Sequence, residues 1–492
     1  MDGEEPMPLL RPGQTCWRVA QAERLAVIVD AADYFAHVRE AILNARHSVF
    51  LIGWDFDTRI PLQRPSHDAP HPNKLGKFLS WVIDKRPDLR IYVLRWDLGA
   101  LNGIARGSTS LVMLDWMTDK RIRFRLDSAH PAGSAHHQKI IVIDDVMAFC
   151  GGIDMTADRW DTRAHLDDDP LRERPTTKRK YGPWHDVSTA VDGEAAQALG
   201  ELARERWFRA TGEDIAPPPP LSGIWPKGLK PNLRDMQVAL SRTAPQYETR
   251  EGIYEIEALY LDAIAAAQRC IYIESQYFAS RKLVKALTAR LREDDSPEII
   301  VINPESADGW LEEAVMGASR AKMLDMIRKA DHRNRFRMFN PVTAKRRAIY
   351  VHAKVMIVDD RFLKVGSSNL NNRSMGFDTE CDLSVEVCVT DANAAAKSRT
   401  ILDLRHDLLA EHLGVEIDAV ERAIEAADGS VIGGIESLLS DGRSLVEFVP
   451  PAISEAQDSM LAENSLLDPE RPSGRRKGAK RLLRRIRRFL RL

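Results

Sequence analysis

The chain has 492 residues, a formal net charge of −2 and 44% hydrophobic residues, which describes an ordinary globular protein long enough for several domains. No apolar run is long enough to cross a membrane as a helix, and the acidic first residues are unlike an export signal. We therefore expect a cytoplasmic or peripheral membrane protein, unless it is exported by a route without a cleaved signal.

The charge is distributed unevenly along the chain. Residues 475–492 hold ten Lys or Arg and no acid, and subtracting these ten charges from the total of −2 leaves −12 on residues 1–474. An acidic body is a poor surface for nucleic acid, whereas a basic tail suits an anionic membrane. Apolar residues on one helical face of the tail predict an amphipathic membrane-binding helix. A solvated tail, or one that contacts the acidic body, is the alternative.

Five cysteines are scattered along the chain without a C-x-x-C spacing. This pattern argues against a disulfide framework and against a thiolate zinc site, and it suits a reducing compartment.

Helical and strand patterns alternate through the first part of the chain. Helices are expected at 33–46, 74–85 and 110–119, and apolar strands at 48–54, 90–94 and 121–126. This alternation indicates an α/β layer around a largely buried sheet.

The same order begins again near residue 250. A predicted helix at 253–267 leads to strands at 270–278, 299–302 and 335–339. The duplication predicts an α/β fold of two similar α/β/α lobes with mixed sheets, packed about a pseudo-twofold axis with the active site at the lobe interface.

The expected division of the chain follows from this duplication. It comprises an N-terminal lobe (1–210), a Pro-rich linker (211–235), a C-terminal lobe (236–415), a weakly structured extension (416–474) with one helix at 418–427, and the basic tail (475–492).

Each lobe carries a motif of the same spacing. Its positions are filled first by His137, Lys139, Asp144, Gly151 and Asp154, and then by His352, Lys354, Asp359, Gly366 and Asn369. Residues two apart in a strand point the same way, so each His and Lys share a face while each Asp points elsewhere. Two His–Lys pairs are costly to bury as core, and their repetition predicts one shared catalytic site.

Two imidazoles and two ammonium groups suit phosphodiester chemistry. The lysines would bind the non-bridging oxygens and replace a metal ion. One imidazole would attack phosphorus, and the other would protonate the leaving alcohol and then deprotonate water or another alcohol. We therefore expect neither a metal nor another cofactor.

Further residues are expected to complete the site. The phosphate cradle is assigned to Gly151, Gly366, Ser367, Asn369 and Asp154. An acid must fix each histidine tautomer, and the candidates downstream of the motifs are Asp161 and Glu380. Turn capping, or pairing with Arg159 and Arg373, is the alternative role for these two acids.

The motifs resemble those of the phospholipase D superfamily, which has a duplicated HxKxxxxD followed by GG or GS and then Asp or Asn. The resemblance covers roughly 22–415, and the segments at 151–155, 159–165, 183–187, 271–278 and 411–414 look like the eukaryotic-type phospholipase D core. It implies that His137 is the nucleophile, that His352 is the general acid/base, and that Asp144 and Asp359 are structural. Ser275 departs from the usual Asn, and we expect no lipid-targeting domain before the core.

Other residues near the motifs have two interpretations. His165 and His185 either line the substrate entrance or are hydrogen-bonded structural histidines. Tyr272 and Trp184 are expected to be core aromatics and not substrate-stacking residues.

The expected activity is hydrolysis of phosphatidylcholine-like phospholipids to phosphatidic acid and the head-group alcohol through a phosphohistidine, with transphosphatidylation to alcohols. The alternatives are a cardiolipin-synthase-like phosphatidyltransferase, a nuclease of the same superfamily, an inactive relative, and a membrane-bound scaffold. The expected partners are the phospholipid and an anionic membrane surface bound through 475–492, with no nucleic acid and a monomeric chain.

Overall fold

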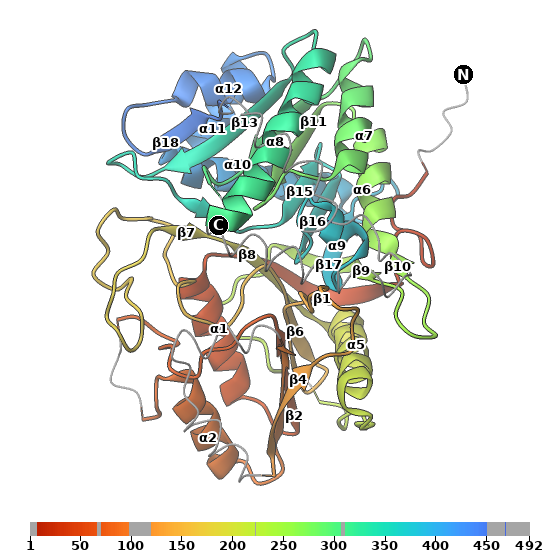
Figure 1. Ribbon diagram of the computed structural model, residues 1–492, viewed down its shortest axis with the longest axis vertical. Coiled ribbons are helices and arrows are strands. Elements are labelled where there is room, and N and C mark those ends of the chain that lie inside the picture. Colours follow the sequence, from red (N-terminus) through yellow and green to blue (C-terminus); the bar gives the residue numbers. More distant parts are fainter. Residues whose placement is uncertain are drawn as a thin grey trace, which may run out of the picture.

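The computed structural model describes residues 7–65, 70–97, 120–221, 223–306, 310–449 and 468. Figure 1 shows its two halves one above the other, with the N-terminal half below and the C-terminal half above. Each half contributes one part of a mixed sheet with helices on both sides.

The N-terminal half follows the expected alternation of helices and strands. Its strands are β1 (Arg18–Val29), β2 (Ser48–Gly53), β3 (Arg90–Trp96), β4 (Ile122–Asp127), β5 (Ile140–Ile143), β6 (Met147–Gly151), β7 (Trp184–His185) and β8 (Val187–Asp192). Its helices are α1 (Ala31–Leu43), α2 (Leu75–Lys85) and α5 (Gly193–Thr211). The expected elements at 33–46, 48–54, 74–85, 90–94 and 121–126 are confirmed, whereas the helix expected at 110–119 lies outside the described residues.

The C-terminal half repeats this order. Its strands are β9 (Leu233–Ala244), β10 (Ile253–Tyr254), β11 (Cys270–Glu274), β12 (Glu298–Ile302), β13 (Phe336–Val342), β14 (Tyr350–Val351), β15 (Val355–Val358), β16 (Phe362–Gly366) and β17 (Glu380–Glu386). Its helices are α6 (Glu255–Ala266), α7 (Arg281–Leu291), α8 (Trp310–Ala330), α9 (Asn372–Gly376) and α10 (Ala394–Leu413). The predicted helix at 253–267 and the strands that begin at 270, 299 and 335 are confirmed, although the strand expected to reach 278 ends at Glu274.

The extension after residue 415 is more ordered than the sequence suggests. It forms α11 (Ile417–Ala426), α12 (Val431–Leu438) and β18 (Ser444–Glu447), and β18 pairs antiparallel with β13 at the sheet edge. The helix expected at 418–427 is confirmed, but the prediction of weak structure is wrong for 417–447. Apolar residues of α11 and α12, such as Val420 and Ile435, are buried against the C-terminal half, which explains the order. The basic tail at 475–492 lies outside the described residues.

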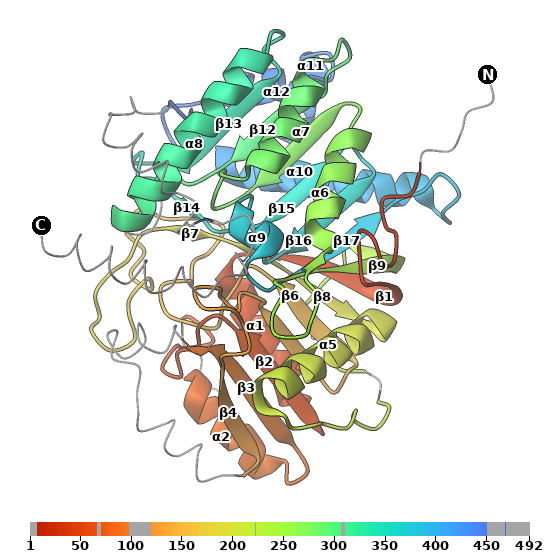
Figure 2. The same ribbon diagram turned by 45° about the vertical axis from the view of Figure 1, so that its right-hand side comes forward.

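The two halves join edge to edge in one 16-stranded sheet. The strand order is β18-β13-β12-β11-β15-β16-β17-β9-β1-β8-β6-β5-β2-β3-β4, with β10 paired to β9. The antiparallel pair β1–β9 lies at the junction, where Gln21 stands opposite Gln237. Outward from this junction, equivalent strands of the two halves occur in the same order: β1-β8-β6-β5-β2-β3-β4 on one side and β9-β17-β16-β15-β11-β12-β13 on the other (Figure 2). This order is that of two halves related by a pseudo-twofold axis.

The sheet is buried on both faces, as its apolar strands predict. In β2, Val49 and Leu51 pack with α1 and α2, whereas Phe50 and Ile52 pack in the core that includes α5. The latter core continues into the C-terminal half, so one apolar layer crosses the junction between the halves. Among the described helices, none has both the length and the apolar character required to cross a bilayer.

Candidate active site

The two motif histidines lie where the halves meet. Each precedes a central strand, β5 or β15, and each is tied by its backbone to the opposite half. The His137 N–H donates to the Thr379 carbonyl at 3.0 Å, and the His352 N–H donates to the His185 carbonyl at 2.8 Å. The two copies of the motif therefore contribute to one site.

Glu380 orients His137 from the opposite half. Its Oε2 lies 2.9 Å from His137 Nδ1. Ser367 Oγ donates to Oε2 at 2.5 Å, and Ser374 Oγ donates to Oε1 at 2.7 Å. With Nδ1 engaged in this way, the ring turns Nε2 away from Glu380, so Nε2 is the nitrogen available for chemistry. Glu380 thus has the place predicted for a histidine-orienting acid.

Asp186 takes the equivalent place beside His352, and the prediction of Asp161 is wrong. Asp186 Oδ2 lies 2.7 Å from His352 Nδ1, and its Oδ1 accepts from the Val187 N–H at 2.9 Å. The Asp161 carboxylate instead contacts His165 at 3.0 Å and Arg172 at 3.0 Å. Each motif histidine is therefore oriented by a carboxylate that the other half supplies.

Asp186 can be found in the sequence by its position before a strand, but not by its distance from the first motif. Glu380 stands at the start of β17, and Asp186 stands just before the equivalent strand β8. The N-terminal half has a long loop between Asp161 and β7, so counting forward from the motif stops at Asp161 before it reaches the right acid.

The two lysines differ in their surroundings. Lys139 Nζ lies 3.3 Å from Asp154 and donates to the His137 carbonyl at 2.9 Å. Lys354 Nζ donates to the His352 carbonyl, and within the described part of the chain it makes no ion pair. Asn369, which holds the position equivalent to Asp154, leaves its buried Oδ1 without a hydrogen-bond partner there. The second half therefore brings a less neutralised ammonium group to the site.

Burial shifts the pKa values of the site in consistent directions. Burial, Lys139 and Lys354 hold the pKa of His137 well below its usual value, and burial raises the pKa of Glu380 to about 8. Both shifts favour the uncharged form of each partner in this buried pair. Burial, Lys354 and Arg159 likewise hold the pKa of His352 well below its usual value.

The motif aspartates are structural, in agreement with the strand-parity argument. Asp144 accepts from the N–H groups of Arg46, His47 and Ser48 at 2.6–2.8 Å, which fixes the turn from α1 into β2. Asp359 accepts in the same way from three N–H groups at 268–270, before β11. Neither carboxylate contacts a motif histidine or lysine.

The phosphate cradle expected at the glycines and at Ser367 stays a prediction, because in the structure these residues are hydrogen-bonded to other parts of the chain. The Gly151 and Gly366 N–H groups donate to the carbonyls of Lys139 and Lys354 at 3.4 and 3.2 Å, so they are engaged within the sheet. A Cβ at Gly366 would lie 1.9 Å from an Asp382 oxygen, so glycine is required for close packing of β16 against β17. Ser367 binds Glu380, as described above.

The remaining candidates have supporting positions. His165 and His185 are buried and hydrogen-bonded, which matches their structural interpretation and not a substrate entrance. Trp184 stacks on Tyr350 with ring centroids 4.6 Å apart and lies 5.3 Å from the His352 ring, so it forms a wall of the site. Tyr272 is a buried aromatic, as expected.

Ser275, where the sequence departs from the family pattern, also supports the structure. Its Oγ accepts from the Leu370 N–H at 3.1 Å and donates to the Tyr277 carbonyl at 2.8 Å. It therefore joins the end of β11 to the loop that follows the second motif.

Comparisons with known proteins agree with this architecture. A family model described as "Phospholipase D" matches residues 41–218, and one described as "Cardiolipin synthase, PLD-like domain" matches residues 260–402. Each match contains one copy of the motif.

Named relatives align with most of this chain at low identity. Phospholipase D A of Dictyostelium discoideum is 27% identical over 81% of this chain and 36% of its own length. Phospholipase D alpha 1 of Vigna unguiculata is 24% identical over 79% of this chain and 65% of its own length. The chain thus spans from about a third to about two thirds of the length of these relatives.

A solved structure shows the same fold. The phosphatidylserine synthase of Haemophilus influenzae superposes with a TM-score of 0.53 at 12% identity, over 85% of this chain and 96% of that one. With its two phospholipase D-like domains and its duplicated motif, the chain belongs to the phospholipase D superfamily.

Proposed function

We propose that the protein is a phosphodiesterase that cleaves phosphatidylcholine-like phospholipids to phosphatidic acid and a head-group alcohol through a phosphohistidine. The observation that carries this proposal is the reciprocal pairing of His137 with Glu380 and His352 with Asp186, since each half of the chain orients the other half's histidine. Two oriented imidazoles beside two lysines form an acid–base and nucleophile set for phosphoryl transfer.

The first step forms an N–P bond and breaks a P–O bond. Nε2 of His137 attacks phosphorus, and His352 gives its Nε2 proton to the departing head-group oxygen. Lys139 and Lys354 hold the non-bridging oxygens and stabilise the charge of the transition state. The negative charge of the bound phosphodiester favours protonated His352, against the lowering of its pKa by burial and Lys354 in the free protein.

The second step reverses these roles. His352 takes a proton from water, the new oxygen bonds to phosphorus, and the N–P bond to His137 breaks. When an alcohol replaces water, the product is the corresponding phosphatidyl ester. Hydrolysis and transphosphatidylation therefore share one intermediate.

A phosphatidyltransferase that uses a glycerol-bearing lipid as acceptor is the second candidate. The cardiolipin synthase family model over 260–402 and the fold shared with a phosphatidylserine synthase favour keeping it. The two candidates differ only in the acceptor of the second step.

The deciding experiment supplies pure protein with labelled phosphatidylcholine, cardiolipin precursors or single-stranded DNA, with and without ethanol. We expect head-group release from phosphatidylcholine and formation of phosphatidylethanol, and loss of both in the His137→Asn variant. Dominant transfer to the glycerol-bearing lipid would instead favour the transferase. Cleavage of DNA alone, or undiminished release by the variant, would overturn the proposal.

A further inference from the structure

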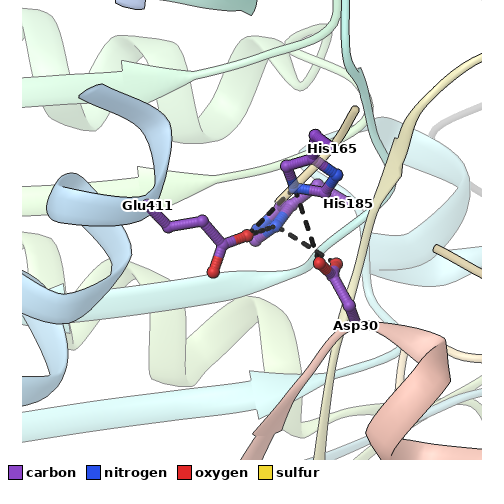
Figure 3. A group of neighbouring side chains, drawn as sticks. All are labelled: Asp30, His165, His185 and Glu411. Atoms are coloured by element: carbon purple, nitrogen blue, oxygen red, sulfur yellow. Dashed lines mark hydrogen bonds and ion pairs between the residues drawn. The ribbon is translucent and has the colours of Figure 1, made fainter. Parts of the chain in front are cut away.

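A second cluster of ionisable side chains lies buried behind His352. It consists of Asp30, which follows β1, His165 in the loop after Asp161, His185 on β7 and Glu411 on α10. All four are buried. Figure 3 shows the two imidazole rings lying close together, with the Glu411 and Asp30 carboxylates directed towards them. The phosphodiester chemistry described above does not use this cluster.

The atoms that face one another have the spacing of a metal coordination shell. Glu411 Oε1 lies 3.1 Å from His165 Nε2 and 2.8 Å from His185 Nδ1. Asp30 completes the group, with Oδ2 3.5 Å from His165 Nε2 and Oδ1 3.5 Å from His185 Nδ1. Ligands about 2.0–2.1 Å from a tetrahedral ion are about 3.3 Å from one another. One ligand atom from each of the four residues lies within 4.8 Å of the other three, so a small closure would bring them to an ion.

The outward-facing nitrogen of each ring is already engaged by a carboxylate. His165 Nδ1 lies 3.0 Å from Asp161 Oδ2, and His185 Nε2 lies 2.8 Å from Glu274 Oε2. A histidine that binds a metal through one nitrogen nearly always donates the other N–H to such an acceptor, which fixes the tautomer. Both rings therefore have the second partner that a metal-binding histidine requires.

Asp30 supplies an independent indication of a ligand. Its Oδ1 accepts from the Asp186 N–H at 3.2 Å, whereas its buried Oδ2 accepts no hydrogen bond and has only the ion-pair contact with His165 Nε2 at 3.5 Å. A buried carboxylate oxygen that accepts no hydrogen bond is unfavourable. This oxygen is directed towards the two rings, where a cation would satisfy it.

We propose that Asp30, His165, His185 and Glu411 bind one Zn²⁺ ion in a closed structural site. Two imidazoles and two carboxylates form a donor set that suits zinc, whereas Ca²⁺ and Mg²⁺ prefer all-oxygen shells. Zinc replaces the protons on His165 Nε2 and His185 Nδ1, and these are released on binding. The missing C-x-x-C spacing argues against a thiolate site but not against a site of imidazoles and carboxylates.

The location connects the ion to the acid–base arm of the active site. His185 accepts the His352 backbone N–H through its carbonyl, and the next residue, Asp186, orients the His352 ring. Asp30 also binds the Asp186 backbone. An ion at this point would hold the segment that carries the orienting carboxylate.

The competing account is a metal-free network of imidazolium and carboxylate groups. Burial opposes a charge on His165, but Asp30, Asp161 and Glu411 raise its pKa to about 9. In that account two protons occupy the space between the rings and the acids. The experiment must therefore detect the ion itself and not only the importance of the residues.

The full chain is expressed with added zinc, purified without chelator and analysed for metal by mass spectrometry. We expect about one zinc per chain, retained through dialysis. Protein produced with cobalt should show the visible bands of tetrahedral Co²⁺, and X-ray absorption should show a shell of nitrogen and oxygen only.

Three variants assign the ion to the cluster. His165→Gln and His185→Gln should reduce the metal content at least about tenfold, because each removes one ligand. His136→Gln is the matched control, since His136 is also buried and lies 2.9 Å from Thr379 Oγ1 and 3.5 Å from Asp127, away from the cluster. It should keep the ion.

The wild-type measurements decide the proposal even if the variants do not fold. Folded wild-type protein with neither zinc nor cobalt bands would establish the metal-free network and overturn the proposal. Sulfur in the metal shell, or equal loss of metal in His136→Gln, would also overturn it. None of these readouts depends on phospholipid cleavage, so the metal site and the proposed function can fail separately.

Discussion

The reciprocal pairing of carboxylate and histidine is most sharply tested at Asp186. In Asp186→Asn the side chain keeps its size, but one oxygen becomes an amide that donates. The Val187 N–H at 2.9 Å holds the remaining oxygen, so the amide faces His352 Nδ1. We expect neutral His352 to carry its proton on Nε2 and the imidazolium form to be disfavoured, although this form donates a proton in the first step and is produced by the proton transfer in the second.

The magnitude follows from the contact that is lost. A hydrogen bond to a charged group contributes about 1.5–3 kcal/mol, which corresponds to roughly 10- to 150-fold in rate. Inversion of the tautomer raises the expected loss towards about 10⁴-fold, the effect of the same change in the serine-protease triad. We therefore expect a loss of about 10² to 10⁴ in kcat, with formation and hydrolysis of the phosphohistidine both slowed.

The assay is rapid quenching with a short-chain soluble phosphatidylcholine. Head-group release without a burst would show that formation of the phosphohistidine is slowed, and a burst of about one head group per chain would show that its hydrolysis is slower still. Asp161→Asn is the matched control, because Asp161 is also buried and bonds a histidine, His165, but not a motif histidine. Its turnover per folded molecule should stay within about tenfold of wild type. Near-normal turnover by Asp186→Asn, or an equal loss in both variants, would refute the assignment of Asp186.

Three further predictions concern stability, pH and the tail. Asp144→Ala leaves three N–H groups without their acceptor. It should lower the free energy of unfolding, measured with urea, by about 3 kcal/mol and change turnover per folded molecule little. Loss of turnover without loss of stability would contradict the structural role. Burial lowers the pKa of Lys354 to about 7, so its ammonium group loses its charge as the pH rises through that value. Binding of dimethyl phosphate to the His137→Asn variant should therefore weaken over this pH range. A Kd that does not change with pH would contradict this prediction. Deletion of 475–492 should reduce binding to anionic vesicles, because each basic residue near the membrane contributes about 1 kcal/mol. Hydrolysis of a soluble short-chain substrate should not change. Equal loss of vesicle binding and of hydrolysis would show that the tail belongs to the fold.

Much of the site followed from the sequence because it depends on local geometry. The spacing from His137 to Lys139 and its repetition at His352 place each pair on one face of an extended segment, whatever the rest of the chain does. By the same strand parity Asp144 points away from His137 and Lys139, and in the structure it fixes the turn into β2. These conclusions needed only the geometry of a strand and the cost of burying charge.

The errors arose where a partner is distant in the sequence. Asp161 lies just downstream of the first motif, as Glu380 lies just downstream of the second. The loop before β7 breaks that correspondence, and Asp186 occupies the place instead. The glycines were assigned to phosphate, but close packing of neighbouring strands accounts for Gly366.

The sequence by itself determined the duplicated α/β order and the two His–Lys pairs, because periodicity and spacing are properties of a single segment. Only the tertiary structure decided that the halves share one sheet through β1 and β9, and that each half orients the other's histidine. It also gathered Asp30, His165, His185 and Glu411, which lie far apart in the sequence. Such contacts depend on where the pseudo-twofold axis lies, and no local pattern encodes that position.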